Sequence, residues 1–133
     1  MPDEFTLARI ETGAKAAKDA DPRHFLYVMG AIAALRGDVD AVRKHFESCI
    51  EIHGMDATTV YNYASALLGA GCGVLAYVQA RRGVAAFPMN DDLRELLSNV
   101  TARMTAEMWD DMDHDSEEDL TRMCMMNFAA GDD

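Results

Sequence analysis

Matched residues spaced 34 positions apart limit the possible folds of this chain more than any other feature. Gly37 and Gly71 stand in two expected turns, and the small residues Gly30 and Ala64 lie inside two expected helices at the same separation. Three further pairs share this spacing: Tyr27 with Tyr61, Val42 with Ala76, and Gly54 with Pro88. Small residues midway along a helix let a neighbouring helix approach closely, so their recurrence predicts stacked antiparallel helix pairs.

The local pattern is helical throughout. Apolar residues recur at three- and four-residue spacing and β-branched alternation is missing, so we expect an all-α fold. Six main helices are expected, over residues 4–18, 22–35, 39–52, 57–69, 74–86 and 91–108, and a short seventh follows Ser116. Asp21, Asp38 and Asp56 are expected N-caps, because short polar side chains satisfy the free amides of a first turn. The sixth helix is expected to carry one apolar stripe: Leu93, Leu97, Val100, Met104 and Met108.

Two units, 23–56 and 57–90, carry side chains of matching size at matching positions. The first has Leu26, Met29, Gly30 and Ala33, followed by Val42, Phe46 and Cys49. The second has Val60, Tyr63, Ala64 and Leu67, followed by Ala76, Ala80, Gly83 and the closing Phe87-Pro88. In type and period these units resemble the tetratricopeptide repeat family.

The chain departs from the family pattern at three places. Gly54 replaces the usual proline, Ala80 replaces an aromatic residue, and the turn 71–74 has no acidic cap. Helix 74–86 also contains Gly83, which costs about 1 kcal/mol relative to Ala. We therefore expect this helix to be intrinsically the weakest.

The resemblance implies a short α-solenoid. Residues 1–22 would form an N-terminal capping helix, 23–90 the two repeats, 91–112 a C-terminal capping helix, and 113–133 an acidic tail with a short methionine-rich helix. It also implies a concave groove formed by the first helix of each pair. The groove residues would be Tyr27, Ala31, Ala34, Leu35, Tyr61, Asn62, Ser65 and Leu68.

The expected groove residues point to an apolar peptide or helix as the partner. Family members that clamp a terminal carboxylate use Lys, Arg and Asn, whereas this chain offers tyrosines, small apolar residues and Asn62. The competing interpretation is that Tyr27 and Tyr61 only cover the core, or are covered by the chain itself. We hypothesise that the segment Leu120–Phe128 folds back on this groove or on a neighbouring apolar face.

The charge of the chain is concentrated at its C-terminal end. The sequence has 12 basic and 23 acidic side chains, a net charge of −11, of which residues 107–133 contribute −9. This charge disfavours nucleic-acid binding, and the acidic run is interpreted as a solvated tail or as an arm for a basic partner.

The number of cysteines bears on the compartment, since three cysteines favour a reducing compartment over a disulfide scaffold. No signal peptide or span-length apolar run is found, so a cytoplasmic protein without membrane contact is expected.

No catalytic motif is found, and we expect no enzyme activity, no cofactor and no metal. The run Gly69–Gly73 is interpreted as a turn, since a helix and not a strand precedes it.

The chain has ten methionines, which is an unusually large number. Thioether side chains are flexible and adapt to partner surfaces. A possible second interface is formed by Met104, Met108, Trp109, Met112, Leu120, Met123 and Phe128. The same residues are also explained as the core face of a capping helix, or, with Cys124 and His114, as soft-metal ligands.

Three classes of function follow. The leading one is a non-enzymatic adaptor, a small chaperone-like protein or an inhibitor of the antitoxin kind, which binds a peptide or helix of a protein partner. The alternative is a structural protein that forms a homodimer through its methionine-rich C-terminal helix. An enzyme or a soft-metal carrier is the least favoured.

Overall fold

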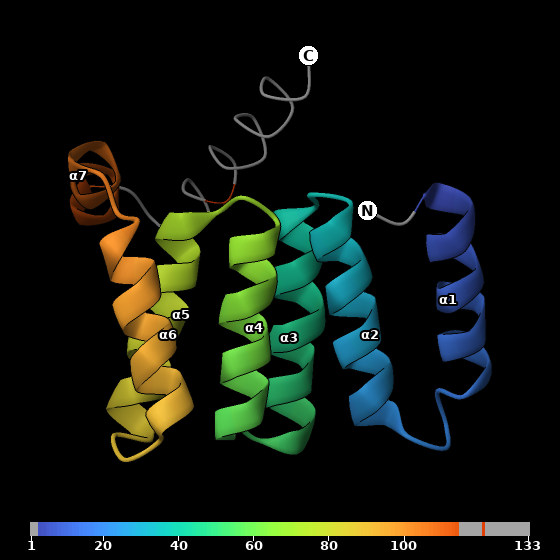
Figure 1. Ribbon diagram of the computed structural model, residues 1–133. Helices are drawn as coiled ribbons and strands as arrows, with labels where there is room; N and C mark the ends of the chain where they lie inside the picture. The colour runs from blue at the N-terminus through green and yellow to red at the C-terminus, as the bar shows by residue number, and fades with distance from the viewer. Residues whose placement is uncertain (1–2, 115–120, 122–133) are drawn as a thin grey trace.

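Helices account for all the regular secondary structure of the described part of the chain. The computed structural model describes residues 3–114 and residue 121 (Figure 1). Within them lie seven helices and no strand, which confirms the all-α prediction. The helices are α1 (Glu4–Ala16), α2 (Pro22–Leu35), α3 (Val39–His53), α4 (Ala57–Gly69), α5 (Gly73–Ala86), α6 (Asp91–Ala102) and α7 (Ala106–His114). The short helix expected after Ser116 lies outside the described residues.

Side-chain caps set where most helices begin. Five short polar residues each accept a hydrogen bond from the backbone N–H three residues further on: Asp3, Asp21, Asp38, Asp56 and Asn90. Helix α5 is different, because Cys72 stands at its N-cap position and makes no side-chain cap bond. The sequence predicted this missing acidic cap.

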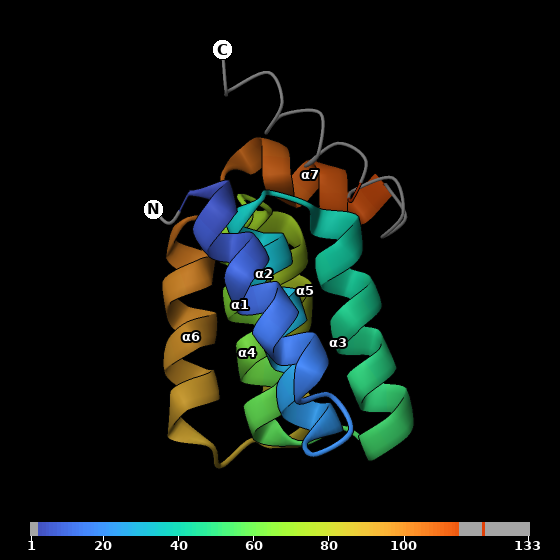
Figure 2. The same ribbon diagram turned by 90° about the vertical axis from the view of Figure 1, so that its right-hand side faces the viewer.

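Neighbouring helices pack side by side, and the chain reverses direction at each turn from α1 to α6 (Figure 1). Helix α2 contacts both α3 and α4, and α4 contacts α5 and α6. As a result α2, α4 and α6 form one row, and all three begin at the same end of the molecule (Figure 1). Figure 2 shows α3 and α6 on opposite sides of the molecule.

Close approach of the helices depends on two glycines inside them. A Cβ atom at Gly30 would overlap the ring of Phe46, which is buried in the core. A Cβ atom at Gly83 would lie 2.7 Å from Val60 Cγ1 and 3.0 Å from Leu93 Cδ2. Gly83 therefore lowers the helix propensity of α5, as expected, but it also lets α5 pack closely against its neighbours.

The prediction of one continuous helix over 91–108, within a capping unit of 91–112, is wrong. Helix α6 ends at Ala102, and α7 begins at Ala106. Thr105 starts the new helix, because its Oγ1 accepts a hydrogen bond from the N–H of Met108 at 3.2 Å. The buried stripe of α6 also differs from the expected one, since Leu96 and not Leu97 is buried. Figure 2 shows that α7 lies across one end of the other helices.

Helix α1 contacts the rest of the protein through one buried side chain and a set of ion pairs. It ends at Ala16, two residues before the expected end, and Leu7 is its one buried residue. Arg36, just after α2, donates to Glu4 Oε2 at 3.1 Å and to Glu11 Oε2 at 3.2 Å. These ion pairs fix α1 against the end of α2.

The cysteines differ in their chemical state. Cys49 is buried and free, whereas Cys72 is disulfide-bonded. The expectation of a reducing compartment over a disulfide scaffold did not anticipate this bond at Cys72, since cysteine number alone does not show which side chains come together. No helix within the described residues is long and apolar enough to cross a membrane.

Candidate interaction groove

An open cavity of about 570 Å³ lies between α2 and α4. We call it the α2/α4 groove. Its lining residues are His24, Tyr27, Val28, Ala31, Ala34, Leu35, Phe46, Asn62, Ser65, Ala66 and Gly69. The lining is mostly apolar, and Phe46 is its one contribution from α3.

Six of the eight residues predicted for a groove line this cavity: Tyr27, Ala31, Ala34, Leu35, Asn62 and Ser65. Tyr61 lies elsewhere, in a smaller hollow between α4 and α6 that we call the α4/α6 hollow. Ala57, Thr58, Asn90 and Asp92 also line that hollow. Leu68 is half-buried and packs against the hydrophobic core. The cavity thus brings most of the expected residues together, but neither Tyr61 nor Leu68 is among those that line it.

Sequence reasoning missed five of the lining residues: His24, Val28, Phe46, Ala66 and Gly69. Gly69 had a detectable signal, because it stands 34 residues after Leu35. It was expected at the end of the helix 57–69 and at the start of the following turn, and it is the last residue of α4. His24 and Val28 lie on the same face of α2 as Tyr27 and Ala31, so helical spacing could have found them.

Small side chains produce the hollow. Ala31 and Ala34 on α2 face the cavity, as do Ala66 and Gly69 on α4. A Cβ atom at Gly69 would meet no other atom within 4 Å. Because these side chains do not fill the space between the two helices, an apolar surface stays open to solvent.

Tyr27 at the wall of the groove makes both a hydrogen bond and a ring contact. Its hydroxyl lies 2.6 Å from Thr59 Oγ1, and its ring stacks on Phe46 with a centroid separation of 6.1 Å. Phe46 in turn stacks on Tyr63 at 5.2 Å. Burial raises the pKa of Tyr27, although the hydrogen bond to Thr59 opposes the effect. Tyr27 therefore belongs to the core as well as to the groove.

Asn62 and Ser65 supply the polar groups of the α4 wall. Both are half-buried, and neither makes a side-chain hydrogen bond to another residue of the described chain. The Asn62 amide both donates and accepts, and the Ser65 hydroxyl does the same. An apolar hollow with such groups at one wall suits an apolar side chain whose own main chain needs hydrogen-bond partners.

Among the side chains that the structure describes, no cluster of acidic, histidine and cysteine residues could hold a metal ion. His45 is half-buried, and burial lowers its pKa. Its neighbour one turn along α3, Cys49, is fully buried, and burial raises the pKa of the thiol. Both shifts favour the neutral forms, so this pair resembles core packing more than a reactive site.

Residues of the predicted second interface face the core of the protein. Met108 and Met112 pack against the hydrophobic core. Trp109 makes an edge-on contact with Tyr77 of α5 at 4.8 Å between ring centroids. Met104 lies half-buried between α6 and α7. The other expected members, Leu120, Met123 and Phe128, lie outside the described residues.

A single residue of the C-terminal segment is described, and it contacts α3. Arg43 Nη1 donates to Thr121 Oγ1 at 2.9 Å, and Thr121 is buried. Arg43 is not a lining residue of the α2/α4 groove. Glu47, one turn further along α3, pairs with Arg82 of α5 at 3.0 Å. At residue 121, therefore, the chain meets the side of α3 that carries Arg43.

Comparison with known proteins identified no relative. No family model, no curated protein and no solved structure matches the chain.

Proposed function

We propose that this protein is a non-enzymatic interaction module, adaptor-like, chaperone-like or inhibitor-like, that binds a peptide or helix of a protein partner in the α2/α4 groove. The observation that carries the proposal is the open apolar cavity of about 570 Å³ between two packed helices. An apolar side chain that enters such a hollow leaves water, which is the main favourable term in most protein association.

The finer part of the proposal is a tetratricopeptide-like architecture of two units, 23–56 and 57–90. Its support is a turn that recurs at the 34-residue period. Gly37 and Gly71 have positive φ angles of 72° and 87°. The N–H of Gly37 bonds to the carbonyl of Ala34, and 34 residues later Gly71 bonds in the same way to Leu68. This repetition favours two similar helix pairs stacked with flanking helices as caps.

An extended peptide fits the polar groups of the groove better than a helix does. A helix satisfies its main-chain hydrogen bonds internally, whereas an extended segment leaves its N–H and C=O groups free. Asn62 and Ser65 can pair with such free groups while an apolar side chain enters the cavity. The expected partner is therefore an extended segment with at least one large apolar side chain.

Homodimerisation through the methionine-rich helix is the second proposal, and it has less support. Met108 and Met112 pack on the core, so they leave less apolar surface for a second copy. A dimer of this kind would show a mass that rises with protein concentration.

The test is a paired substitution of two open glycines. Gly69→Leu would place a side chain into the groove, and Gly13→Leu is the matched control, because a Cβ atom at either position meets nothing within 4 Å. Both variants and the unchanged chain would be used to capture partners from an extract of the native host. Tyr27→Ala is less suitable, since it would remove the ring that stacks on Phe46.

The expected result is a stoichiometric protein partner that Gly69→Leu loses and Gly13→Leu retains, with both variants folded by circular dichroism. Retention of the partner by Gly69→Leu would contradict binding in the groove. Capture of nothing except this chain would contradict the adaptor function.

A further inference from the structure

The row of helices that forms the α2/α4 groove continues into an acidic surface on α6. Asp92 lines the α4/α6 hollow beside Tyr61. Glu95 follows one turn later on the same face of α6, since residues three apart are neighbours on a helix. We call Asp92 and Glu95 the acidic pair. Both side chains are exposed, and neither forms an ion pair within residues 3–114.

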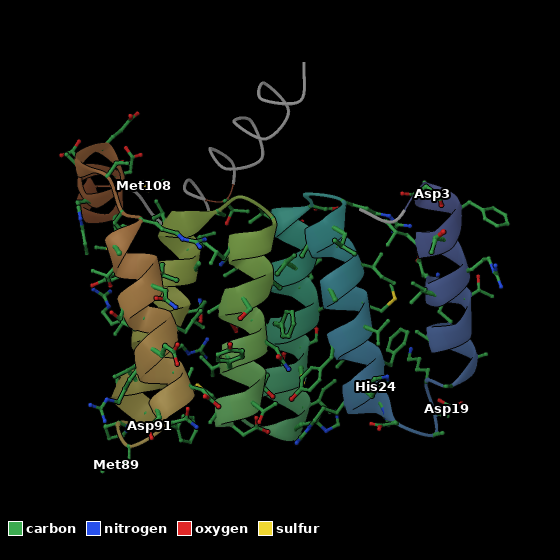
Figure 3. All side chains as sticks on the ribbon, in the orientation of Figure 1. Asp3, Asp19, His24, Met89, Asp91 and Met108 are labelled. Carbon is green, nitrogen blue, oxygen red and sulfur yellow. The ribbon has the colours of Figure 1, made fainter. Side chains whose placement is uncertain are left out.

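The acidic pair and the groove are close together. Asn62 lines the groove and Tyr61 lines the α4/α6 hollow, so consecutive residues of α4 separate the two. Residues near the starts of α2, α4 and α6 lie at the same end of the molecule, because all three helices begin there (Figure 1). Figure 3 labels His24 near the start of α2 and Asp91 at the start of α6, both toward that end. The acidic pair thus flanks the end of the groove where His24 and Tyr27 lie.

We infer that the segment bound in the groove is a cationic extended peptide, with one apolar side chain in the cavity and a Lys or Arg directed at Asp92 and Glu95. This inference rests on the proposed function and specifies its partner. Charge complementarity supports it. An apolar hollow alone accepts any apolar side chain, whereas two exposed carboxylates that form no ion pair within the described residues favour a positive charge on the peptide.

Helix packing sets the spacing between the two side chains of the peptide. Packed helix axes lie about 8–10 Å apart, so the middle of the groove, between α2 and α4, lies roughly 14 Å from the axis of α6. An extended chain advances about 3.3 Å per residue. The basic residue should therefore lie about four positions from the apolar one.

The acidic pair also has a structural role that the test must separate from binding. Asp92 lies in the first turn of α6, where a negative charge stabilises the helix. Glu95 lies beyond that turn, so Glu95→Gln leaves this stabilisation in place. The charge-matched control is Asp40→Asn/Glu51→Gln, which removes one first-turn aspartate and one other exposed carboxylate from α3. Helix α3 lies on the opposite side of the molecule from α6 (Figure 2).

The probe is a phage-displayed library of random peptides, selected in parallel on the full chain, on Asp92→Asn/Glu95→Gln, on Glu95→Gln and on Gly69→Leu. We expect selected peptides to share an apolar residue followed or preceded at about four positions by Lys or Arg. The best peptide, synthesised with a fluorescent label, should bind the double variant about two- to tenfold more weakly at low salt. The α3 control should bind it with unchanged affinity, and Gly69→Leu should not bind it.

The outcomes separate the two proposals. Peptides with an apolar anchor but no basic preference, still lost on Gly69→Leu, would overturn the inference and leave the groove function intact. Equal weakening by the α3 control would also overturn it, because the effect would then come from net charge. Peptides that bind Gly69→Leu normally, or no selected peptide at all, would overturn the groove function itself.

Discussion

Gly30 and Phe46 form a contact that leaves no room for a side chain between α2 and α3. A Cβ atom at Gly30 would overlap the Phe46 ring, which is almost fully buried. The same ring stacks on Tyr27 and lines the α2/α4 groove. One close helix contact therefore determines both the core packing and the floor of the candidate site.

Gly30→Ala should lower the free energy of unfolding by about 1–3 kcal/mol, because overpacking forces the ring and the helix apart. The matched variant Gly13→Ala should instead raise it by up to about 1 kcal/mol, since Gly13 lies exposed in α1 with open space around it. Urea unfolding followed by circular dichroism measures both. A Gly30→Ala protein as stable as the unchanged chain would contradict the close contact.

The protein should lose stability as the pH rises through the alkaline range. Burial raises the pKa of Cys49 from its ordinary value of 9.0, and that of Tyr27 from 10.0. The unfolded chain therefore releases these protons at lower pH than the folded protein does. The stabilisation that the protonated Cys49 thiol and Tyr27 hydroxyl give to the folded protein is fully present below pH 9. It decreases as the pH rises above the ordinary pKa values of these two groups.

Urea unfolding at a series of pH values would test this dependence. Tyr27→Phe should make the loss of stability above about pH 10 less steep, whereas Tyr61→Phe, at an exposed position, should leave the slope unchanged. Equal slopes for the two variants would refute the role assigned to Tyr27.

Removing the charge of Arg36 should detach α1 from α2. Arg36 pairs with Glu4 and Glu11, and Leu7 is the one residue that α1 buries. In Arg36→Gln, the amides of residues 4–16 should exchange hydrogen several-fold faster, while those of α4 and α5 should keep their protection. The control is Lys15→Gln, because the Lys15–Glu11 pair lies within α1 and does not join it to α2. Unchanged exchange in Arg36→Gln would show that Leu7 packing alone holds α1.

The fluorescence of Trp109 should report how α7 docks on α5. Trp109 is the single tryptophan of the chain and packs edge-on against Tyr77. In Tyr77→Ala its emission should move to longer wavelength, since the indole loses a neighbour that keeps water away. Tyr61→Ala, in the α4/α6 hollow, is the control and should leave the emission unchanged. An unchanged spectrum in Tyr77→Ala would contradict the docking of α7.

The sequence by itself determined the first five helices and the start of the sixth. Asp21, Asp38, Asp56 and Asn90 each act on an amide three residues away, so a short stretch of sequence contains all the information needed. The 34-residue spacing likewise placed the turn glycines, because the positive φ of Gly71 repeats that of Gly37. The resemblance to the tetratricopeptide family, which rests on residue types at this spacing, was enough to name six of the residues that line the groove.

Only the tertiary structure decided which of these positions remain open and which are filled. Leu68 was predicted for the groove but packs on the core, whereas Gly69 was not predicted for the groove and lines the cavity. The direction of α7 after the break at Ala102 was likewise seen only in the tertiary structure, where Trp109 packs against Tyr77 of α5. The physical reason is range: caps and turns are set by neighbours in the chain, whereas a cavity is the space left between helices whose contacts join distant residues.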